Sequence, residues 1–231
     1  MRADLFAPPL PGLFIVLGAM GSGKTEFSVN LALSFAARGA KTALADLDVV
    51  NPYFRSRGQG DVLLEHGVRL VAPPGALLES DLPVIPAEAY ALVQDETLAA
   101  VLDVGGGRTG ARVLGMFAPQ IARRAPAVYY VLNRSRRENG TPARVLASLA
   151  EIGAVSGLSV TGIVHNTHLL GYTTPGTVLE GAETAAEVSR LTGIPVVCHA
   201  VREDLLPSLP MLSPAFPMRP RLSRPWEDAG I

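Results

Sequence analysis

Short apolar runs alternate with longer segments of helical periodicity along most of the 231-residue chain. The apolar runs have the length of strands, are rich in Val, Ile and Leu, and cover residues 13–17, 41–46, 68–71, 98–104, 127–132, 160–166 and 195–200. Helix-like segments between them cover residues 24–38, 88–94, 110–124, 142–152 and 177–191. Because the strand-like runs are continuously apolar, they predict a mostly parallel sheet covered by helices on both faces.

The regular alternation of strands and helices predicts an α/β fold with a doubly wound sheet. The length suits one sizeable domain, and an apolar content of 48% suits a well-filled core. We therefore assign residues 1–204 to a single domain.

Residues 205–231 differ from the rest because they carry prolines at positions 207, 210, 214, 217, 220 and 225. Proline lacks the backbone N–H that a helix interior or a central strand needs, so this C-terminal extension is expected to form neither. It can lie extended across the domain or act as a free docking arm. Its interleaved Leu, Met, Phe and Trp side chains favour packing on the domain.

The most informative motif is a glycine-rich stretch between the first predicted strand and the first predicted helix, which fits the pattern G-x-x-x-x-G-K-[ST]. In this context, backbone N–H groups surround phosphate oxygens, the lysine reaches the β- and γ-phosphates, and the threonine hydroxyl can bind Mg²⁺. A glycine-rich turn without a ligand is the alternative. The pattern predicts a nucleoside triphosphate site made by Gly18, Ala19, Met20, Gly21, Ser22, Gly23, Lys24, Thr25 and the next helix residue, Glu26.

Carboxylates follow two other predicted strands. Asp46 and Asp48 end the second strand, and Asp103 ends the fourth strand before the glycines 105–107. Carboxyl ends of neighbouring parallel strands meet at one edge of a sheet, so these acids can face one Mg²⁺. We expect Asp46 and Asp103 to support the metal with Thr25, and Asp48 to orient or deprotonate an attacking water. Turn-capping or solvated acids are the alternative.

The order of these motifs (P-loop, D-x-D, then D-x-G-G-G) resembles the MinD/ParA and CobQ/CobB nucleotide-binding superfamily, of the SIMIBI class of P-loop NTPases, over residues 12–204. Residues 46–57, 164–170 and 173–175 look like an uncharacterised bacterial ATP-binding subgroup. The resemblance implies that Lys24 is catalytic, that Asp48 lies in switch I, and that Asp103 is the Walker-B acid before switch II. It also implies an adenine site at Asn166, completed by the loop after the last strand with Val201 and Arg202.

One position departs from that pattern. Ala19 stands where the MinD/ParA motif has a second lysine, which reaches across a dimer to the partner's nucleotide. A nucleotide-dependent homodimer is therefore an open alternative, and Arg55, Arg57 and Arg134 are candidates for the missing cation. Residues 166–169 lack the N-K-x-D motif of related GTPases, which favours ATP over GTP.

The composition limits the classes of partner and the cellular location that we expect. A formal net charge of −1 gives no general attraction to nucleic acid or to an anionic membrane. The chain shows neither a signal peptide nor a membrane-spanning run, so we expect a cytoplasmic protein. Cys198, the only cysteine, is expected to be a buried core thiol, and His165 and His168 form at most a weak metal pair.

We conclude from the sequence that the chain binds ATP and Mg²⁺ and is an ATPase whose switch segments, residues 46–57 and 103–110, regulate a protein partner. Two alternatives remain. One is ATP-dependent phosphoryl transfer or ligation on a small molecule. The other is a nucleotide-sensing module that binds ATP or ADP without turnover.

Overall fold

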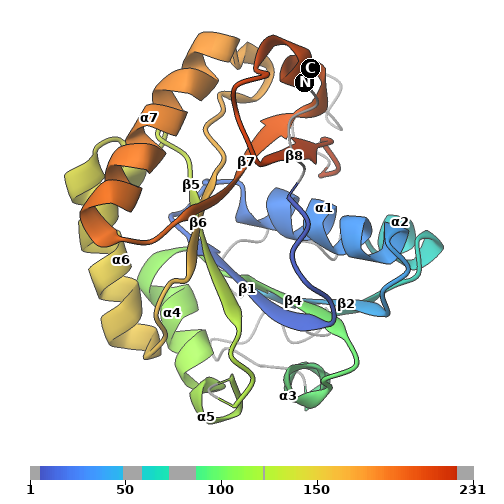
Figure 1. Ribbon diagram of the computed structural model, residues 1–231. Coiled ribbons are helices and arrows are strands. Elements are labelled where there is room, and N and C mark those ends of the chain that lie inside the picture. Colours follow the sequence, from blue (N-terminus) through green and yellow to red (C-terminus); the bar gives the residue numbers. More distant parts are fainter. Residues whose placement is uncertain (1–5, 49–58, 73–86, 122, 223–231) are drawn as a thin grey trace, which may run out of the picture.

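The computed structural model describes residues 6–48, 59–72, 87–121 and 123–222, and it is an α/β domain (Figure 1). The sheet in the described residues has eight strands in the order β3-β2-β4-β1-β5-β6-β7-β8, and every neighbouring pair is parallel. The strands are β1 (Gly12–Gly18), β2 (Thr42–Leu47), β3 (Val68–Val71), β4 (Ala99–Val104), β5 (Ala127–Leu132), β6 (Gly162–His165), β7 (Val196–Arg202) and β8 (Ala215–Met218).

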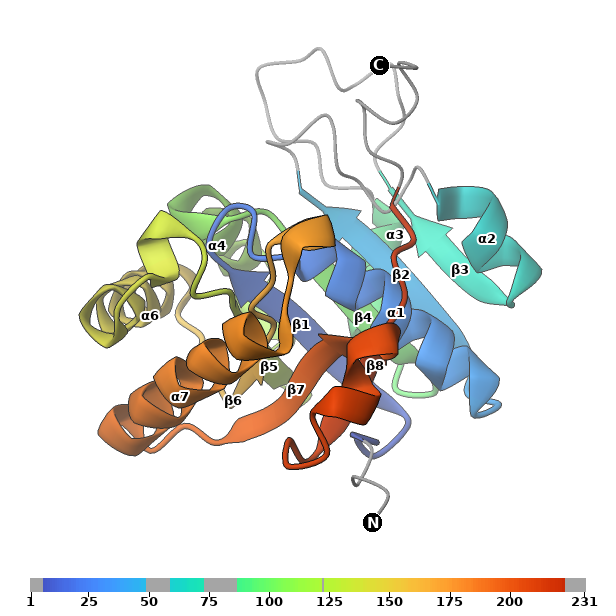
Figure 2. The same cartoon turned by 90° about the horizontal axis from the view of Figure 1, so that it is seen from above.

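Helices cover both faces, as predicted (Figures 1 and 2). One face carries α1 (Lys24–Ala37) and α2 (Gly60–Glu65). The other carries α3 (Ala87–Gln94), α4 (Gly107–Gly115), α5 (Ala118–Ile121), α6 (Pro142–Ser156) and α7 (Pro175–Thr192). Short 3₁₀ helices occupy Arg137–Asn139, Leu170–Tyr172 and Glu203–Ser208. None of the helices in these ranges has both the length and the apolar content to cross a bilayer.

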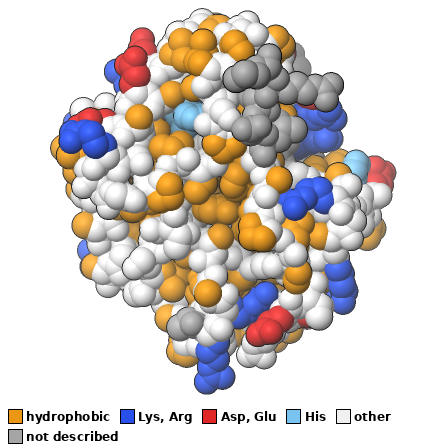
Figure 3. Space-filling view, viewed as in Figure 1, with side chains coloured by type: hydrophobic (Ala, Val, Ile, Leu, Met, Phe, Trp, Pro, Cys, Tyr) orange, Lys and Arg blue, Asp and Glu red, His pale blue; other side chains and the backbone are white. Residues whose placement is uncertain are grey.

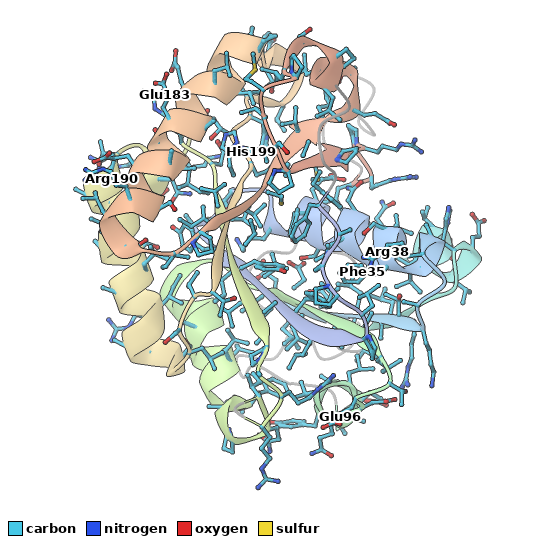
Figure 4. The ribbon with its side chains drawn as sticks, in the orientation of Figure 1. Phe35, Arg38, Glu96, Glu183, Arg190 and His199 are labelled. Carbon is cyan, nitrogen blue, oxygen red and sulfur yellow. The ribbon has the colours of Figure 1, made fainter. Side chains whose placement is uncertain are left out.

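The core has two halves because successive side chains of a strand point to opposite faces. On β1, Leu13 and Ile15 pack in the cluster under α3–α7, whereas Phe14 and Val16 pack in the cluster under α1 and α2. Figure 4 shows Phe35 reaching from α1, and its ring centroid lies 4.7 Å from that of Phe14. The continuous apolar run of a strand buried on both faces is thereby explained.

All seven predicted strands are present, but the predicted helix over residues 110–124 is wrong as a single element. The chain forms α4 and then the short α5, with a break at Met116 and Phe117. Pro119 cannot donate a hydrogen bond to the carbonyl of Gly115, and its ring would clash there. Phe117 turns into the core instead, with its ring centroid 4.4 Å from that of Tyr90.

The proline-rich end packs on the domain as far as residue 222. β8 is an edge strand that pairs with β7, and Phe216 and Met218 are buried against α1 and the central strands. An edge position tolerates Pro217, whose missing N–H breaks no inner ladder. The domain boundary after residue 204 stays a prediction.

Candidate nucleotide-binding site

The glycine-rich loop (residues 18–25, the phosphate loop) leaves the carboxyl end of β1, which has β4 on one side and β5 on the other. Its backbone runs close to its neighbours. A Cβ on Gly18 would lie 2.6 Å from the carbonyl oxygen of Val131, and one on Gly23 would lie 2.4 Å from Nδ2 of Asn166. Gly23 also has φ +88° and provides no side chain to cap α1. The N–H groups at the start of α1 are therefore available to bind an anion.

Lys24 is the buried cation of the loop, with 6% of its surface exposed. Its Nζ donates a hydrogen bond to the carbonyl oxygen of Ala19 at 2.9 Å, so the side chain spans the loop. Burial lowers the pKa of Lys24, and the charges of Asp103 and Asp48 oppose that shift. The ammonium is therefore held close to the predicted carboxylates.

The three predicted acids gather beside the loop. Asp46 on β2 and Asp103 on β4 are register partners, and the backbone N–H of Asp48 donates to Oδ1 of Asp46 at 3.1 Å. Burial and then the charge of Asp46 raise the pKa of Asp103 to about 7, while Lys24 and a hydrogen bond with the Thr25 hydroxyl lower it. Ser28 Oγ donates to Asp103 Oδ1 at 3.2 Å. Crowded, buried carboxylates of this kind are stabilised by a cation.

These donors fit a magnesium ion. Carboxylate and hydroxyl oxygens are the hard ligands that Mg²⁺ prefers, and Thr25 and Asp103 present them side by side. In the part of the chain that the structure describes, no three His, Cys, Asp or Glu side chains form a self-sufficient metal site. The arrangement suits an ion that also uses phosphate oxygens and water as ligands.

The glycines after β4 connect the acids to the phosphate loop. A Cβ on Gly105 would lie 3.0 Å from Oδ1 of Asp48, and one on Gly106 would lie 3.0 Å from the backbone of Met20. The predicted switch II backbone therefore touches both switch I and the phosphate loop. Of the predicted switch I segment, residues 49–57 lie outside the described residues, and so do Arg55 and Arg57.

A cavity of about 560 Å³ opens over the phosphate loop. Ten of the predicted site residues line it: Met20, Gly21, Gly23, Lys24, Thr25, Glu26, Asp48, Asn166, Val201 and Arg202. The others are buried and are not part of its lining: Gly18, Ala19, Ser22, Asp46 and Asp103. The lining also includes the apolar residues Leu170, Val178, Met218, Pro220 and Leu222. The cavity thus combines polar side chains that suit phosphates with apolar side chains that suit a base.

Two side chains from neighbouring strands brace the phosphate loop. Asn166, directly after β6, donates from Nδ2 to the carbonyl oxygen of Ser22 at 2.9 Å. Arg136, after β5, donates from Nε to the carbonyl oxygen of Gly21 at 2.8 Å. Arg136 was not among the predicted site residues, although its basic cluster is visible in the sequence. Arg134 instead forms an exposed ion pair with Glu180 at 2.6 Å.

The lining of the cavity outside the phosphate loop differs from the prediction in two respects. Val201 and Arg202 belong to β7 itself, which runs past residue 200, and not to a loop after it. Arg202 pairs with Asp204 at 2.8 Å and donates from Nη1 to the carbonyl oxygen of Leu170 at 3.1 Å. Met218, Pro220 and Leu222 also line this cavity, and no pattern in the sequence predicted that.

Glu26 lines the cavity, but its carboxylate faces the C-terminal segment. Oε1 accepts the backbone N–H of Arg221 at 2.6 Å, and Oε2 accepts that of Leu222 at 3.2 Å. Burial raises the pKa of Glu26, and these two hydrogen bonds oppose the rise.

His165 pairs with His199 of the neighbouring strand, and their Nδ1 atoms lie 3.1 Å apart. Figure 4 marks His199 on β7. Burial, with a smaller effect of His199, lowers the pKa of His165 to about 3, so the pair is neutral at pH 7. Cys198 is buried, as predicted, and burial raises the pKa of its thiol.

Comparisons with solved structures agree with this fold. The signal recognition particle 54 kDa protein of Aeropyrum pernix K1, solved with GDP, is 24% identical and has a TM-score of 0.56, over 84% of this chain and 42% of that chain. FtsY of Thermotoga maritima is 25% identical with a TM-score of 0.53, over 85% of this chain and 64% of that chain. The chain spans less than two thirds of either protein.

No curated protein matches the chain. The sequence pattern of the CobQ/CobB/MinD/ParA nucleotide binding domain, however, matches residues 13–171, which is more than half of the chain. This range holds the phosphate loop, the three acids and Asn166. The chain therefore belongs to the CobQ/CobB/MinD/ParA nucleotide-binding family of P-loop NTPases.

Proposed function

We propose that the protein binds ATP with Mg²⁺ in this cavity and hydrolyses it, and that its switch segments regulate a protein partner. The observation that carries the proposal is the gathering of the Lys24 ammonium, the Thr25 hydroxyl and the Asp48 carboxylate at the phosphate end of one cavity. The buried Asp103 interacts with all three, through a hydrogen bond with Thr25 and through the charges of Lys24 and Asp48. Family membership alone would support nucleotide binding but no particular chemistry.

In this proposal the phosphate loop binds the phosphates through its N–H groups, and Lys24 exchanges its bond with the Ala19 carbonyl for phosphate oxygens. Thr25 and Asp103 hold the metal, directly and through water. A bound Mg²⁺ would neutralise charge on the γ-phosphate as it develops. Asp48 orients the attacking water and accepts its proton.

ATP is favoured over GTP by the residues at the end of β6. Aligned at Asn166, the chain has Thr167 and Leu169 where an N-K-x-D motif would place its lysine and its acid for guanine. An asparagine side chain can both donate to and accept from an adenine edge. Val201 and Arg202 contribute further lining to this cavity.

The contacts of the glycines after β4 support the proposed regulation of a partner. Since Gly105 and Gly106 touch Asp48 and Met20, a γ-phosphate can change both switch segments together. With Ala19 in place of the second lysine, a partner protein or a second copy of the chain is a source of the missing cation. The face in Figure 3 carries its charged side chains around the periphery, with no continuous basic patch for nucleic acid among its coloured residues.

The test compares Lys24→Ala with Lys41→Ala, which removes the only other lysine, an exposed one. We expect Lys24→Ala to abolish Mg-dependent ATP binding in calorimetry and to abolish phosphate release, and Lys41→Ala to change neither. Light scattering in ADP and in a non-hydrolysable ATP analogue tests the homodimer. Equal ATP affinity in wild type and Lys24→Ala would refute the phosphate site. Tight ATP binding without phosphate release would favour the sensing module.

Phosphoryl transfer to a small molecule is the second candidate, and one observation favours it. A second cavity, of about 550 Å³, shares Met20 and Gly106 with the first and is lined further by Arg137, Arg144 and Glu151. An acceptor there would lie next to the γ-phosphate end. ADP release that requires a metabolite, and is absent with water alone, would support this function over hydrolysis.

A further inference from the structure

The helix that starts at the phosphate loop also holds the C-terminal segment. Glu26, one residue after Thr25, accepts the backbone N–H groups of Arg221 and Leu222 on its two carboxylate oxygens. One turn later, Asn30 donates from Nδ2 to Oε1 of Glu26 at 3.2 Å. The carboxylate is thus shared between helix and segment and is kept in one orientation.

Asn30 binds the same segment a second time. Its Nδ2 donates to the carbonyl oxygen of Arg219 at 3.0 Å, and its Oδ1 accepts the N–H of Arg219 at 3.1 Å. The Arg219 side chain donates to Glu203 at 2.6 and 2.9 Å. The main chain of residues 219–222 is therefore fixed by hydrogen bonds that span 189 to 196 residues of sequence.

Alternate residues of this fixed segment face the nucleotide cavity. Met218, Pro220 and Leu222 line it, together with Lys24 and Thr25. An extended chain sends successive side chains to opposite sides, so anchoring the backbone between them sets the position of the lining side chains. All three are apolar, and they line the same cavity as the phosphate loop.

We propose that Glu26 and Asn30 are positioning residues that hold Met218, Pro220 and Leu222 as the wall on which the base of the nucleotide packs. The inference rests on the proposed function, because it assumes that a nucleoside triphosphate occupies the cavity. Glu26 acts through the wall and touches no reacting atom. A carboxylate suits this role because it accepts two N–H groups, whereas an amide would turn an NH₂ group toward one of them.

The test separates the base end from the phosphate end by comparing Mg·ATP with Mg·tripolyphosphate, which has no base. We expect Glu26→Gln to weaken ATP binding about tenfold, the effect of losing one hydrogen bond to a charged acceptor, and to leave tripolyphosphate binding unchanged. Leu222→Ala removes wall surface without removing a backbone bond, and we expect the same split. The matched control is Glu183→Gln, an exposed acid on α7 that Figure 4 labels.

Two outcomes overturn the inference: unchanged ATP affinity in both variants, or an equal loss for ATP and tripolyphosphate, which would place the effect at the phosphates. Leu222→Ala keeps the test decisive if Glu26→Gln fails to fold. Wild-type protein that binds neither probe would instead refute the proposed function. Wild-type protein that binds tripolyphosphate as tightly as ATP would refute the base wall.

Discussion

Asp46 and Asp103 are register partners on adjacent parallel strands, and both carboxyl groups are completely buried. Two acids in such a position repel one another when both are charged, and the pKa of Asp103 rises to about 7 as a result of burial and of this neighbour. The ligand-free domain therefore carries a destabilising group at the place where the family holds its nucleotide.

Asp103→Asn is expected to stabilise the ligand-free protein and to weaken Mg-dependent binding. Because folding raises the pKa of Asp103 from 3.8 to about 7, its stability contribution falls as the pH rises through that range. At pH 8 the variant should melt higher by on the order of 5 °C, and this difference should shrink steadily as the pH is lowered toward 4. Its Mg-dependent nucleotide affinity should fall about 10- to 100-fold. The exposed Asp61→Asn is the control for thermal melts, and a lower melting temperature at pH 8 for Asp103→Asn would contradict the argument.

Gly23→Ala is expected to abolish nucleotide binding for two reasons. The new Cβ would lie 2.4 Å from Nδ2 of Asn166, and alanine would be strained at the φ of +88° that Gly23 adopts. Gly39→Ala offers a matched comparison, since Gly39 has φ +81° but nothing within 4 Å of its Cβ position. It should lose only about 1 kcal/mol of stability to backbone strain and bind normally. Calorimetry and denaturant unfolding on both proteins measure the two effects. Equal nucleotide affinities would show that the contact with Asn166 is unimportant.

Arg136→Ala should weaken triphosphate binding several-fold, because the hydrogen bond to the Gly21 carbonyl braces the loop and is worth about 1 kcal/mol. Arg123→Ala removes an exposed arginine that lies away from the cavity lining and should leave binding unchanged. Titrating a fluorescent nucleotide into both variants distinguishes the brace from a general charge effect. A similar loss in both would indicate the latter.

His165→Gln should remove part of the acid sensitivity of the fold. The pKa of His165 is lowered to about 3 in the folded protein, so below pH 6.5 the unfolded chain binds a proton that the folded protein does not. The free energy of unfolding therefore decreases as the pH is lowered. For a whole proton the fall is about 1.4 kcal/mol per pH unit. Urea unfolding at pH 7, 6 and 5 should give a smaller slope for His165→Gln than for wild type or for the exposed His66→Gln. Parallel slopes would mean that His165 does not titrate in this way.

Local patterns predicted most of the fold because the features that position the site are themselves local. Each buried strand is a continuous apolar run, and the motif of the phosphate loop lies within eight consecutive residues. The acids could be placed because the ends of parallel strands meet. The break before α5 was missed because helical periodicity continues past Pro119, although proline cannot continue the hydrogen bonds.

The rest depends on pairs that are far apart in sequence. Glu26 was predicted only as a nucleotide-site residue, and Asn30 looks like an ordinary polar position of α1. Their hydrogen bonds with residues 219–222 connect segments that no local pattern relates. The pairing of His165 with His199 likewise requires the register of β6 and β7. No window of neighbouring residues contains either contact.

The hydrogen bond between Glu26 and Leu222 spans 196 residues, which has a consequence for biosynthesis. During synthesis the phosphate loop leaves the ribosome early, whereas the proposed base wall can form only after the chain has been made beyond residue 222. In a nascent or C-terminally truncated polypeptide, the groups that bind phosphate would be present without the surface proposed to pack on the base. Tight binding of ATP would then identify molecules in which the start of α1 and residues 219–222 have come into contact.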